Sequence, residues 1–212
     1  MAILPSDPPA AVVEAARREV ASRAGKSKIP PSKLSRADPN AIFISMPHRI
    51  AHLPLDSIRS TISLRAAATI GNWRFLIDEK KRREVASNDA QDEFVPIAAA
   101  TMVITAAQTY ELGELNEGPF VAATEEAVRR AEMLPEVQKG RFEALLVIVP
   151  AVYVVALWLQ ERDSDADLLL TLPPSNPGLV PYQPMTSTAF LNIVHKLAQK
   201  VEGDRAPSFR GP

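Results

Sequence analysis

Two histidines, His48 and His52, are spaced so that they could bind a metal. On a helix they would share one face with Asp56, and three such side chains could hold zinc. Pro47 and Pro54 bracket the segment, however, and leave barely one helical turn. No Glu follows the first His, as the metalloprotease motif requires. We therefore expect ordinary surface or loop histidines here and no bound metal.

Three aspartates, Asp163, Asp165 and Asp167, alternate as they do at the start of a calcium-binding loop. Such a loop also needs Gly at its sixth position and Glu at its twelfth, where this chain has Leu168 and Pro174. The pattern therefore excludes an EF-hand. A loose cation site remains an alternative to a solubilising acidic turn between two apolar strands.

The remaining motifs are incomplete. Gly25-Lys26-Ser27 matches the end of a phosphate-binding loop, but Val20 stands where its first glycine belongs. No serine lies in a Gly-x-Ser-x-Gly elbow, and His195 lies beside the apolar face of an expected helix. The chain has no cysteine, which excludes disulfides and thiolate nucleophiles. We therefore expect no catalytic residue, no cofactor and no metal.

Charge is distributed unevenly along the chain. Residues 1–50 hold eight Lys and Arg against four Asp and Glu, whereas residues 51–212 hold 16 against 21. A basic N-terminal region on an acidic body can contact nucleic acid or an anionic membrane, or fold back on its own domain. Lys80 to Arg83 form a second basic group, and neither group is interleaved with aromatic residues that could stack on bases.

Residues 1–40 indicate a basic, proline-rich arm with one amphipathic helix. Ser6 or Asp7 can cap this helix, Pro8-Pro9 suit its first turn, and Gly25 suits its end. Residues 26–40 are expected to be a linker. The apolar stripe is narrow, so it could pack on a partner or on the body. Our candidate partner-binding residues are Val12, Val13, Arg17, Arg18, Val20 and Arg23.

The alternation of apolar residues from Thr61 to Ile70 predicts a strand with one buried face. Gly71-Asn72 is a plausible hairpin turn, followed by a return strand through Trp73, Phe75 and Ile77. We expect a polar connection from Lys80 to Asp92 and then a central strand. That strand falls within Phe94 to Ala107.

Ala144 to Leu159 is a run of 16 residues without a charge. A membrane-spanning helix needs about 20 apolar residues. This run contains Pro150 and many β-branched residues, so we expect two buried strands, Phe142 to Val149 and Ala151 to Leu159. Asp167 to Leu172 is expected to be a further short strand.

Two more helices complete the expected elements. One opens at Gly118-Pro119 and is closed by Pro135, and the other runs from Thr186 or Ser187 to Gly203. The sequence therefore predicts an α+β fold: a mostly antiparallel sheet covered by two amphipathic helices, with an N-terminal helical arm. The expected domains are the arm (1–40), a single α+β domain (41–203) and a flexible tail (204–212).

Three functions fit this distribution of residues. The first is a non-enzymatic interaction or assembly protein whose N-terminal arm contacts a protein partner or its own oligomer. The second is an enzyme or small-molecule binder whose site forms only in three dimensions, with Trp73, Tyr153, Asp163, Asp165 and His48 as possible walls. The third is nucleic-acid binding through the basic arm. We expect a cytoplasmic protein without a transmembrane segment.

Overall fold

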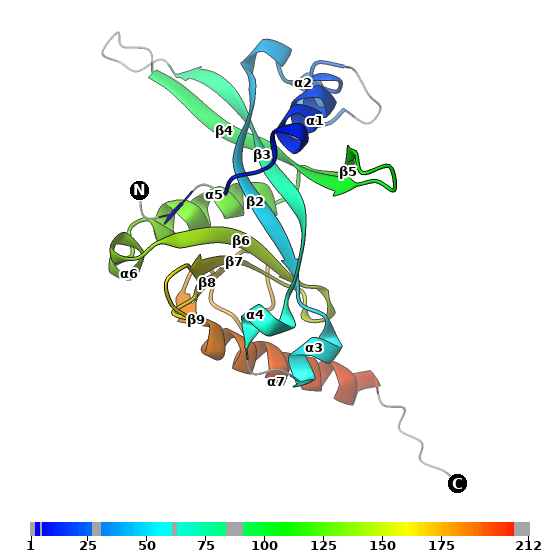
Figure 1. The fold of residues 1–212 in the computed structure, drawn as a ribbon. Helices are drawn as coiled ribbons and strands as arrows, with labels where there is room; N and C mark the ends of the chain where they lie inside the picture. The colour runs from blue at the N-terminus through cyan, green and yellow to red at the C-terminus, as the bar shows by residue number, and fades with distance from the viewer. Residues whose placement is uncertain (1–2, 5, 27–30, 61–62, 84–90, 206–212) are drawn as a thin grey trace. The chain divides into compact units, whose positions relative to one another are not determined.

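The computed structural model describes residues 3–4, 6–26, 31–60, 63–83 and 91–205 (Figure 1). These residues form an α+β structure with a mostly antiparallel sheet and seven α-helices, which confirms the fold class. The chain divides into two compact units. Unit 1 comprises Met1–Leu4, Ile50–Gly71 and Ala127–Pro212, and unit 2 comprises Pro5–Arg49 and Asn72–Glu126. These two units differ from the domains expected from the sequence, whose boundaries lie at residues 40 and 203. The expected domain division stays a prediction.

The sheet of unit 2 consists of four neighbouring strands in the order β5-β4-β3-β2. Their bounds are β2 (Ile42–His52), β3 (Thr69–Arg83), β4 (Gln91–Ile104) and β5 (Tyr110–Asn116), the ends of β2 and β3 belonging to unit 1. β4 is antiparallel to both of its neighbours and lies between them, as expected of a central strand. The expected polar connection from Lys80 to Asp92 is wrong at both ends, since β3 continues to Arg83 and β4 begins at Gln91.

Helix α1 (Ala10–Ala21) buries its apolar stripe in unit 2. Val12 and Ala16 pack with Phe75 and Met102 of the sheet. One turn further on, Val20 packs in a second cluster of the same unit. The stripe is buried by this chain's own sheet because its residues recur every four positions. Neither Ser6 nor Asp7 caps the helix, since its N-cap is Pro9, with no side-chain hydrogen bond.

The expected linker is partly wrong, because residues 31–40 are ordered in unit 2. They form α2 (Lys33–Arg36) and begin the 3₁₀ turn η1 (Pro39–Ala41). Ser32 and Ser35 form a reciprocal capping box, and Leu34 is fully buried among residues of β3 and β4. One buried leucine with a capped turn orders a segment whose composition is otherwise polar. Residues 27–30 lie outside the described residues.

The expected strand from Thr61 to Ile70 is wrong. Residues 61–62 lie outside the described residues, and Leu64–Ala67 form the helix α4. Leu64 and Ala67 are both buried in the core of unit 1, and their spacing of three positions places them on one face of a helix but on opposite faces of a strand. The expected hairpin turn at Gly71-Asn72 is also wrong, because β3 runs through both residues. The segment from Trp73 to Ile77, which we expected to be the return strand of a hairpin, lies within β3.

Unit 1 contains an antiparallel succession of short strands with buried side chains. They are β6 (Phe142–Val149), β7 (Val154–Glu161), β8 (Leu168–Thr171) and β9 (Pro184–Thr186), with β1 (Ile3–Leu4) parallel to β6. The turn η2 (Pro150–Val152) separates β6 from β7, so the two expected buried strands and the break at Pro150 are confirmed. Among the described residues, none of the helices combines the length and apolar character needed to cross a membrane.

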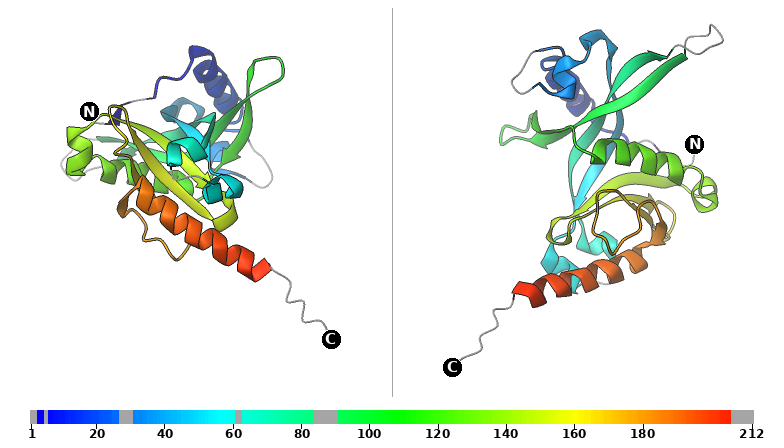
Figure 2. Two further views of the ribbon diagram at one scale, coloured as in Figure 1. Left: turned by 60° about the horizontal axis from the view of Figure 1, so that its bottom comes forward. Right: turned by 180° about the vertical axis from the view of Figure 1, so that it is seen from behind.

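The strands of unit 1 are covered by α7 (Ser187–Arg205), which runs across them in Figure 2. Phe190, Val194 and Ala198 of this helix share a core with Trp158 and Leu169, and α7 continues past the expected stop at Gly203. The shorter helices are α3 (Leu55–Ser60), α5 (Phe120–Ala131) and α6 (Pro135–Lys139). Pro135 therefore begins a helix, where we expected it to close one. The expected covering of the sheet by two helices is not confirmed.

Candidate functional site

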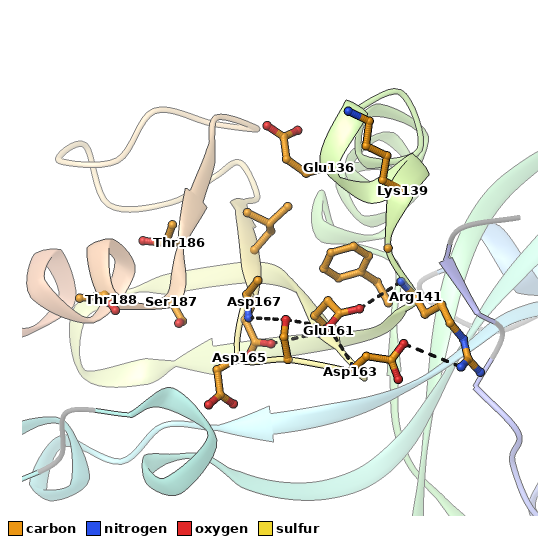
Figure 3. Close-up of a pocket in the computed structure, with 15 residues that line it drawn as sticks. Glu136, Lys139, Arg141, Glu161, Asp163, Asp165, Asp167, Thr186, Ser187 and Thr188 are labelled. Carbon is orange, nitrogen blue, oxygen red and sulfur yellow. Dashed lines mark hydrogen bonds and ion pairs between the residues drawn. The ribbon is translucent and has the colours of Figure 1, made fainter.

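A pocket of about 790 Å³ lies in unit 1, and we call it the acidic-loop pocket. Its walls come from α6 and the start of β6, from the loop after β7, and from the start of α7. Figure 3 shows Glu136 and Lys139 on one side and Thr186, Ser187 and Thr188 on another. The three aspartates of the sequence pattern, Asp163, Asp165 and Asp167, all line this pocket.

Asp167 is a structural carboxylate. Its oxygens accept hydrogen bonds from Arg65 Nε at 3.0 Å, Arg65 Nη2 at 2.6 Å and Trp158 Nε1 at 2.9 Å. The backbone N–H of Glu161 donates a further bond at 3.0 Å. The carboxylate hydrogen-bonds to Arg65 and, with its charge, raises the pKa of that guanidinium. This network ties α4 to the loop after β7.

Glu161 stabilises the same loop from the other side. Its carboxylate accepts hydrogen bonds from the Ser164 hydroxyl at 2.8 Å and from the backbone N–H groups of Asp163 and Arg141 at 2.9 and 3.2 Å. The Ser164 bond, followed by the backbone bonds, holds the pKa of Glu161 below its ordinary value against the opposing effect of burial. Both buried carboxylates of the pocket therefore hold the loop in shape.

The exposed aspartates of this loop are also paired. Asp163 lies 3.8 Å from Arg141 Nη1, and Asp165 lies 3.5 Å from Arg65 Nη1. Across the part of the chain that the structure describes, no three metal-binding side chains come together. The arrangement therefore fits the acidic turn between two strands, and it gives no support to the alternative of a loose cation site.

His48 and His52 lie on a strand, β2, so the helical spacing that would bring them to one face with Asp56 does not apply. His48 is buried, with 1% of its surface exposed, whereas His52 is exposed. Burial is the main cause that lowers the pKa of His48 to about 4, and nearby Arg74 lowers it further. His48 is therefore neutral at pH 7.

Arg74 of β3 is a buried cation that the sequence analysis did not single out. Its Nη1 donates a hydrogen bond to Thr101 Oγ1 at 3.2 Å and lies 3.8 Å from Glu114 Oε2. Burial lowers its pKa from the ordinary value. Arg74 Nε and His48 Nε2 are both buried without a hydrogen-bond partner. The only sequence signal was a charge within the apolar alternation from Trp73 to Ile77.

A groove of about 350 Å³ runs beside α1 in unit 2, and we call it the α1 groove. It is lined by Arg17, Val20, Ala21, Pro39 and Ile42–Ile44. Phe43 at this groove is 44% exposed and packs edge-to-face on Phe94, which is 49% exposed, with the ring centroids 5.4 Å apart. Two of the candidate partner-binding residues, Arg17 and Val20, thus line one groove.

The other candidate partner-binding residues, in α1 and the turn after it, differ in their burial and in their ion pairs. Val12 is fully buried and Val13 is partly buried against the same cluster. Arg18 is exposed and lies 3.9 Å from Glu19, and Arg23 forms a closer ion pair with the same Glu19. Of the six candidates, therefore, Val12 and Val20 are buried, with 0% and 3% of their surface exposed, and Arg23 already has a counter-ion.

The remaining residues singled out in the sequence lie in separate surroundings. The Lys80 ammonium is paired with Asp92 at 2.7 Å, and that of Lys81 with Glu79 at 3.4 Å, so acidic neighbours partly neutralise the second basic group. Trp73 of unit 2 is covered by the Arg49 guanidinium, whose Cζ lies 5.2 Å from the ring centroid. Tyr153 is an exposed residue of unit 1.

Comparison with known proteins identifies no relative: no protein-family model matches the sequence, and no curated protein or solved structure matches it significantly.

Proposed function

We propose that this chain is a non-enzymatic interaction protein that binds a polypeptide segment of a partner in the α1 groove. The observation that carries this proposal is the pair of exposed, mutually packed rings of Phe43 and Phe94, the first of which lines the groove. Exposed aromatic side chains beside a concave apolar surface are typical of protein-binding sites.

The lining of the α1 groove indicates what would occupy it. Val20, Pro39, Ile42 and Ile44 supply apolar walls, and a volume of about 350 Å³ suits one or two side chains. An apolar anchor residue of a partner would gain about 25 cal/mol for each Å² of apolar surface that it buries there.

The charges at the groove indicate which residues would lie next to the apolar anchor in the partner segment. Arg17 is the charged residue of the groove lining, and exposed Arg18 follows it on α1. A partner segment that carries Asp or Glu next to its apolar anchor would complement these guanidinium groups, which favour carboxylates geometrically. We therefore propose an acidic segment with an aromatic or large aliphatic anchor.

The non-enzymatic part of the proposal is supported by the acidic-loop pocket. Its buried carboxylates, Glu161 and Asp167, each accept at least three hydrogen bonds from the protein itself. A general acid or base must exchange a proton with substrate, and carboxylates that organise a loop in this way are poorly suited to that task.

Peptide display on the whole chain tests the proposal. We expect wild-type protein to enrich peptides that carry an apolar anchor beside acidic residues. Phe43→Ser and Arg17→Glu should each weaken these peptides at least tenfold. Arg82→Glu makes the same change as Arg17→Glu, and Ile104→Ser likewise replaces a large exposed apolar side chain by serine, both at exposed positions of unit 2 outside the groove, so these two variants are the controls.

Two outcomes would contradict the proposal: no enriched peptide, or peptides that bind the groove variants as tightly as wild type. Light scattering tests the other occupant, a second copy of the chain. A concentration-dependent dimer that Phe43→Ser abolishes and Ile104→Ser preserves would assign the groove to self-association.

A second candidate function is small-molecule binding in the acidic-loop pocket. It is favoured by the volume of about 790 Å³, within the range of ligand sites, and by walls that the Arg65–Asp167 network holds in place. A compound that raises the Tm of wild type, but not of a Thr188→Trp variant with a filled pocket, would support it. Compounds that stabilise both proteins equally would speak against it.

A further inference from the structure

The α1 groove touches three consecutive residues of β2: Ile42, Phe43 and Ile44. Successive side chains of a strand point to opposite faces of the sheet. Ile42 and Ile44 pack against the cluster that contains Val20 of α1. Phe43 lies on the other face, where it packs on Phe94 and is 44% exposed. Because side chains from both faces line the groove, it runs along the edge of β2 and not over one face of the sheet.

Within the described part of the chain, no strand pairs with this edge at Ile42–Ile44. In the order of the sheet, β2 lies between β3 and β6. Just past the end of β2, the Leu53 N–H donates to the Ile148 carbonyl at 3.0 Å, which places β6 beside that end. β6 spans only Phe142–Val149, so in either strand direction it ends before it reaches Ile42–Ile44, nine or more residues before Leu53.

An extended segment in this groove would present its side chains to two different walls. Side chains on the α1 side would meet buried, apolar Val20 and exposed Arg17. Side chains on the other side would meet the ring of Phe43. Since alternate residues of a strand face opposite ways, the two walls select an alternating sequence. Acidic and apolar residues would occupy every second position, with an aromatic residue between them.

We propose that the partner segment binds as an extended strand, which adds to the edge of β2 at Ile42–Ile44 and alternates its side chains between α1 and Phe43. Backbone hydrogen bonds to β2 would supply affinity that does not depend on sequence, and the two walls would select the side chains. This inference rests on the function proposed for the α1 groove, and it adds the conformation of the partner segment and the order of its residues.

The probe is the peptide acetyl-Glu-Thr-Leu-Tyr-Glu-Thr-amide. In an extended conformation its leucine and both glutamates share the side that would face α1, and its tyrosine lies on the side of Phe43. The control peptide, acetyl-Glu-Thr-Leu-Thr-Tyr-Glu-amide, has the same composition but carries leucine and tyrosine on one side. In NMR titrations of the full-length chain, the probe should bind at least tenfold more tightly than the control peptide.

Methylation of single backbone nitrogens of the probe tests the strand itself. In an added strand, the N–H groups of alternate residues point toward the neighbouring strand, and the others point away from it. N-methylation within one alternate set of residues should therefore weaken binding at least tenfold. N-methylation within the other set should leave the affinity unchanged.

Amide exchange of the full-length chain locates the bound probe. Exchange should slow at one alternate set of β2 amides, either Ile42 and Ile44 or Phe43, because only one set points out of the sheet. The amides of β5, the terminal strand at the other end of the unit 2 sheet, are the internal control and should be unchanged. All three measurements use the unaltered chain, so a folding defect cannot obscure them.

Three results would overturn the inference: equal affinity of the two peptides, N-methylation that weakens binding at every position or at none, or new protection in β5 in place of Ile42–Ile44. Where peptide display still enriches peptides that depend on the α1 groove, such a result removes the strand alone, and the function proposed for the groove stands. Where display enriches no peptide and the probe does not bind, both fail.

Discussion

Arg65 and Asp167 are 102 residues apart in sequence and form a bidentate ion pair, with N–O distances of 2.6 and 3.0 Å. Asp167 is buried, whereas Arg65 keeps about a third of its side chain in solvent. The same guanidinium also donates to the backbone carbonyl of Ser164 at 2.7 Å and to that of Glu161. One arginine of a four-residue helix therefore determines the path of the loop after β7.

The first prediction concerns this pair. Asp167→Asn should lower the free energy of unfolding by about 3 kcal/mol, because it leaves a cation beside a buried site without its counter-charge. Asp165→Asn should change it by less than about 1 kcal/mol, since the Asp165 side chain is 95% exposed. Urea unfolding of both variants measures the difference, and equal losses would show that the pair is not what holds the loop.

The second prediction is a pH dependence of stability that His48 causes. The pKa of His48 is about 4 in the folded chain against an ordinary value of 6.5, so below pH 6.5 the unfolded chain binds the proton more readily. Stability from this group is complete above pH 6.5 and is lost as pH falls toward 4, by about 3 kcal/mol in all. Arg74, the charged neighbour, adds to the cost of protonating the ring.

Unfolding measured at pH 7.5, 5.5 and 4.5 tests this slope. His48→Asn should flatten it, whereas His52→Asn should leave it unchanged because His52 is exposed. A slope that survives in His48→Asn would assign the titration to another group.

The third prediction concerns Glu117, whose carboxylate accepts hydrogen bonds from the backbone N–H groups of Lys33 and Leu34 at 2.7 and 3.0 Å. These bonds outweigh burial and lower the pKa of Glu117. Glu117→Gln should cost about 1 kcal/mol and increase amide exchange at Leu34, because a charged acceptor is replaced by a neutral one. Glu111→Gln, an exposed change on β5, is the control. Unchanged exchange at Leu34 would contradict the assignment.

The same lowered pKa predicts a dependence on acidity. The stabilisation from Glu117 is present above the ordinary Glu pKa and is lost as pH falls through the lower folded value. Protection of the Leu34 amide should therefore decrease at acid pH in wild type and less so in Glu117→Gln.

The fourth prediction concerns Gly25, which has a φ of 66° and approaches Pro39 closely. A Cβ at this position would lie 2.7 Å from Pro39 Cγ. Gly25→Ala should lower the Tm and cost about 1–2 kcal/mol, from the left-handed backbone and the clash together. At Gly71 a Cβ would meet its nearest atom at 3.6 Å, so Gly71→Ala should be close to neutral. Equal effects of the two substitutions would contradict this reasoning.

Local pattern was sufficient where one signal prevailed. The charge-free run from Ala144 to Leu159 with a proline in it has one solution in a protein core, two strands with a break, and β6, η2 and β7 follow it. The sequence pattern also predicted the apolar stripe of α1 and the glycine after it, Gly25, which has a left-handed conformation. Local pattern was insufficient from Ser63 to Asn72, because Leu64, Ala66 and Ala68 alternate as in a strand, whereas Leu64 and Ala67 are spaced as on one helix face.

The sequence by itself determined the α+β class, the absence of cysteine chemistry and the positions of the buried strands β6 and β7, because these depend on composition and on periodicity within about ten residues. Only the tertiary structure decided that Arg65 meets Asp167, that Arg17 and Val20 line a groove with Phe43, and that Arg74 is buried against Thr101. Each of these relationships joins segments far apart in the chain. No periodicity encodes such a contact, since its energy depends on burial and on which partner the fold brings within reach.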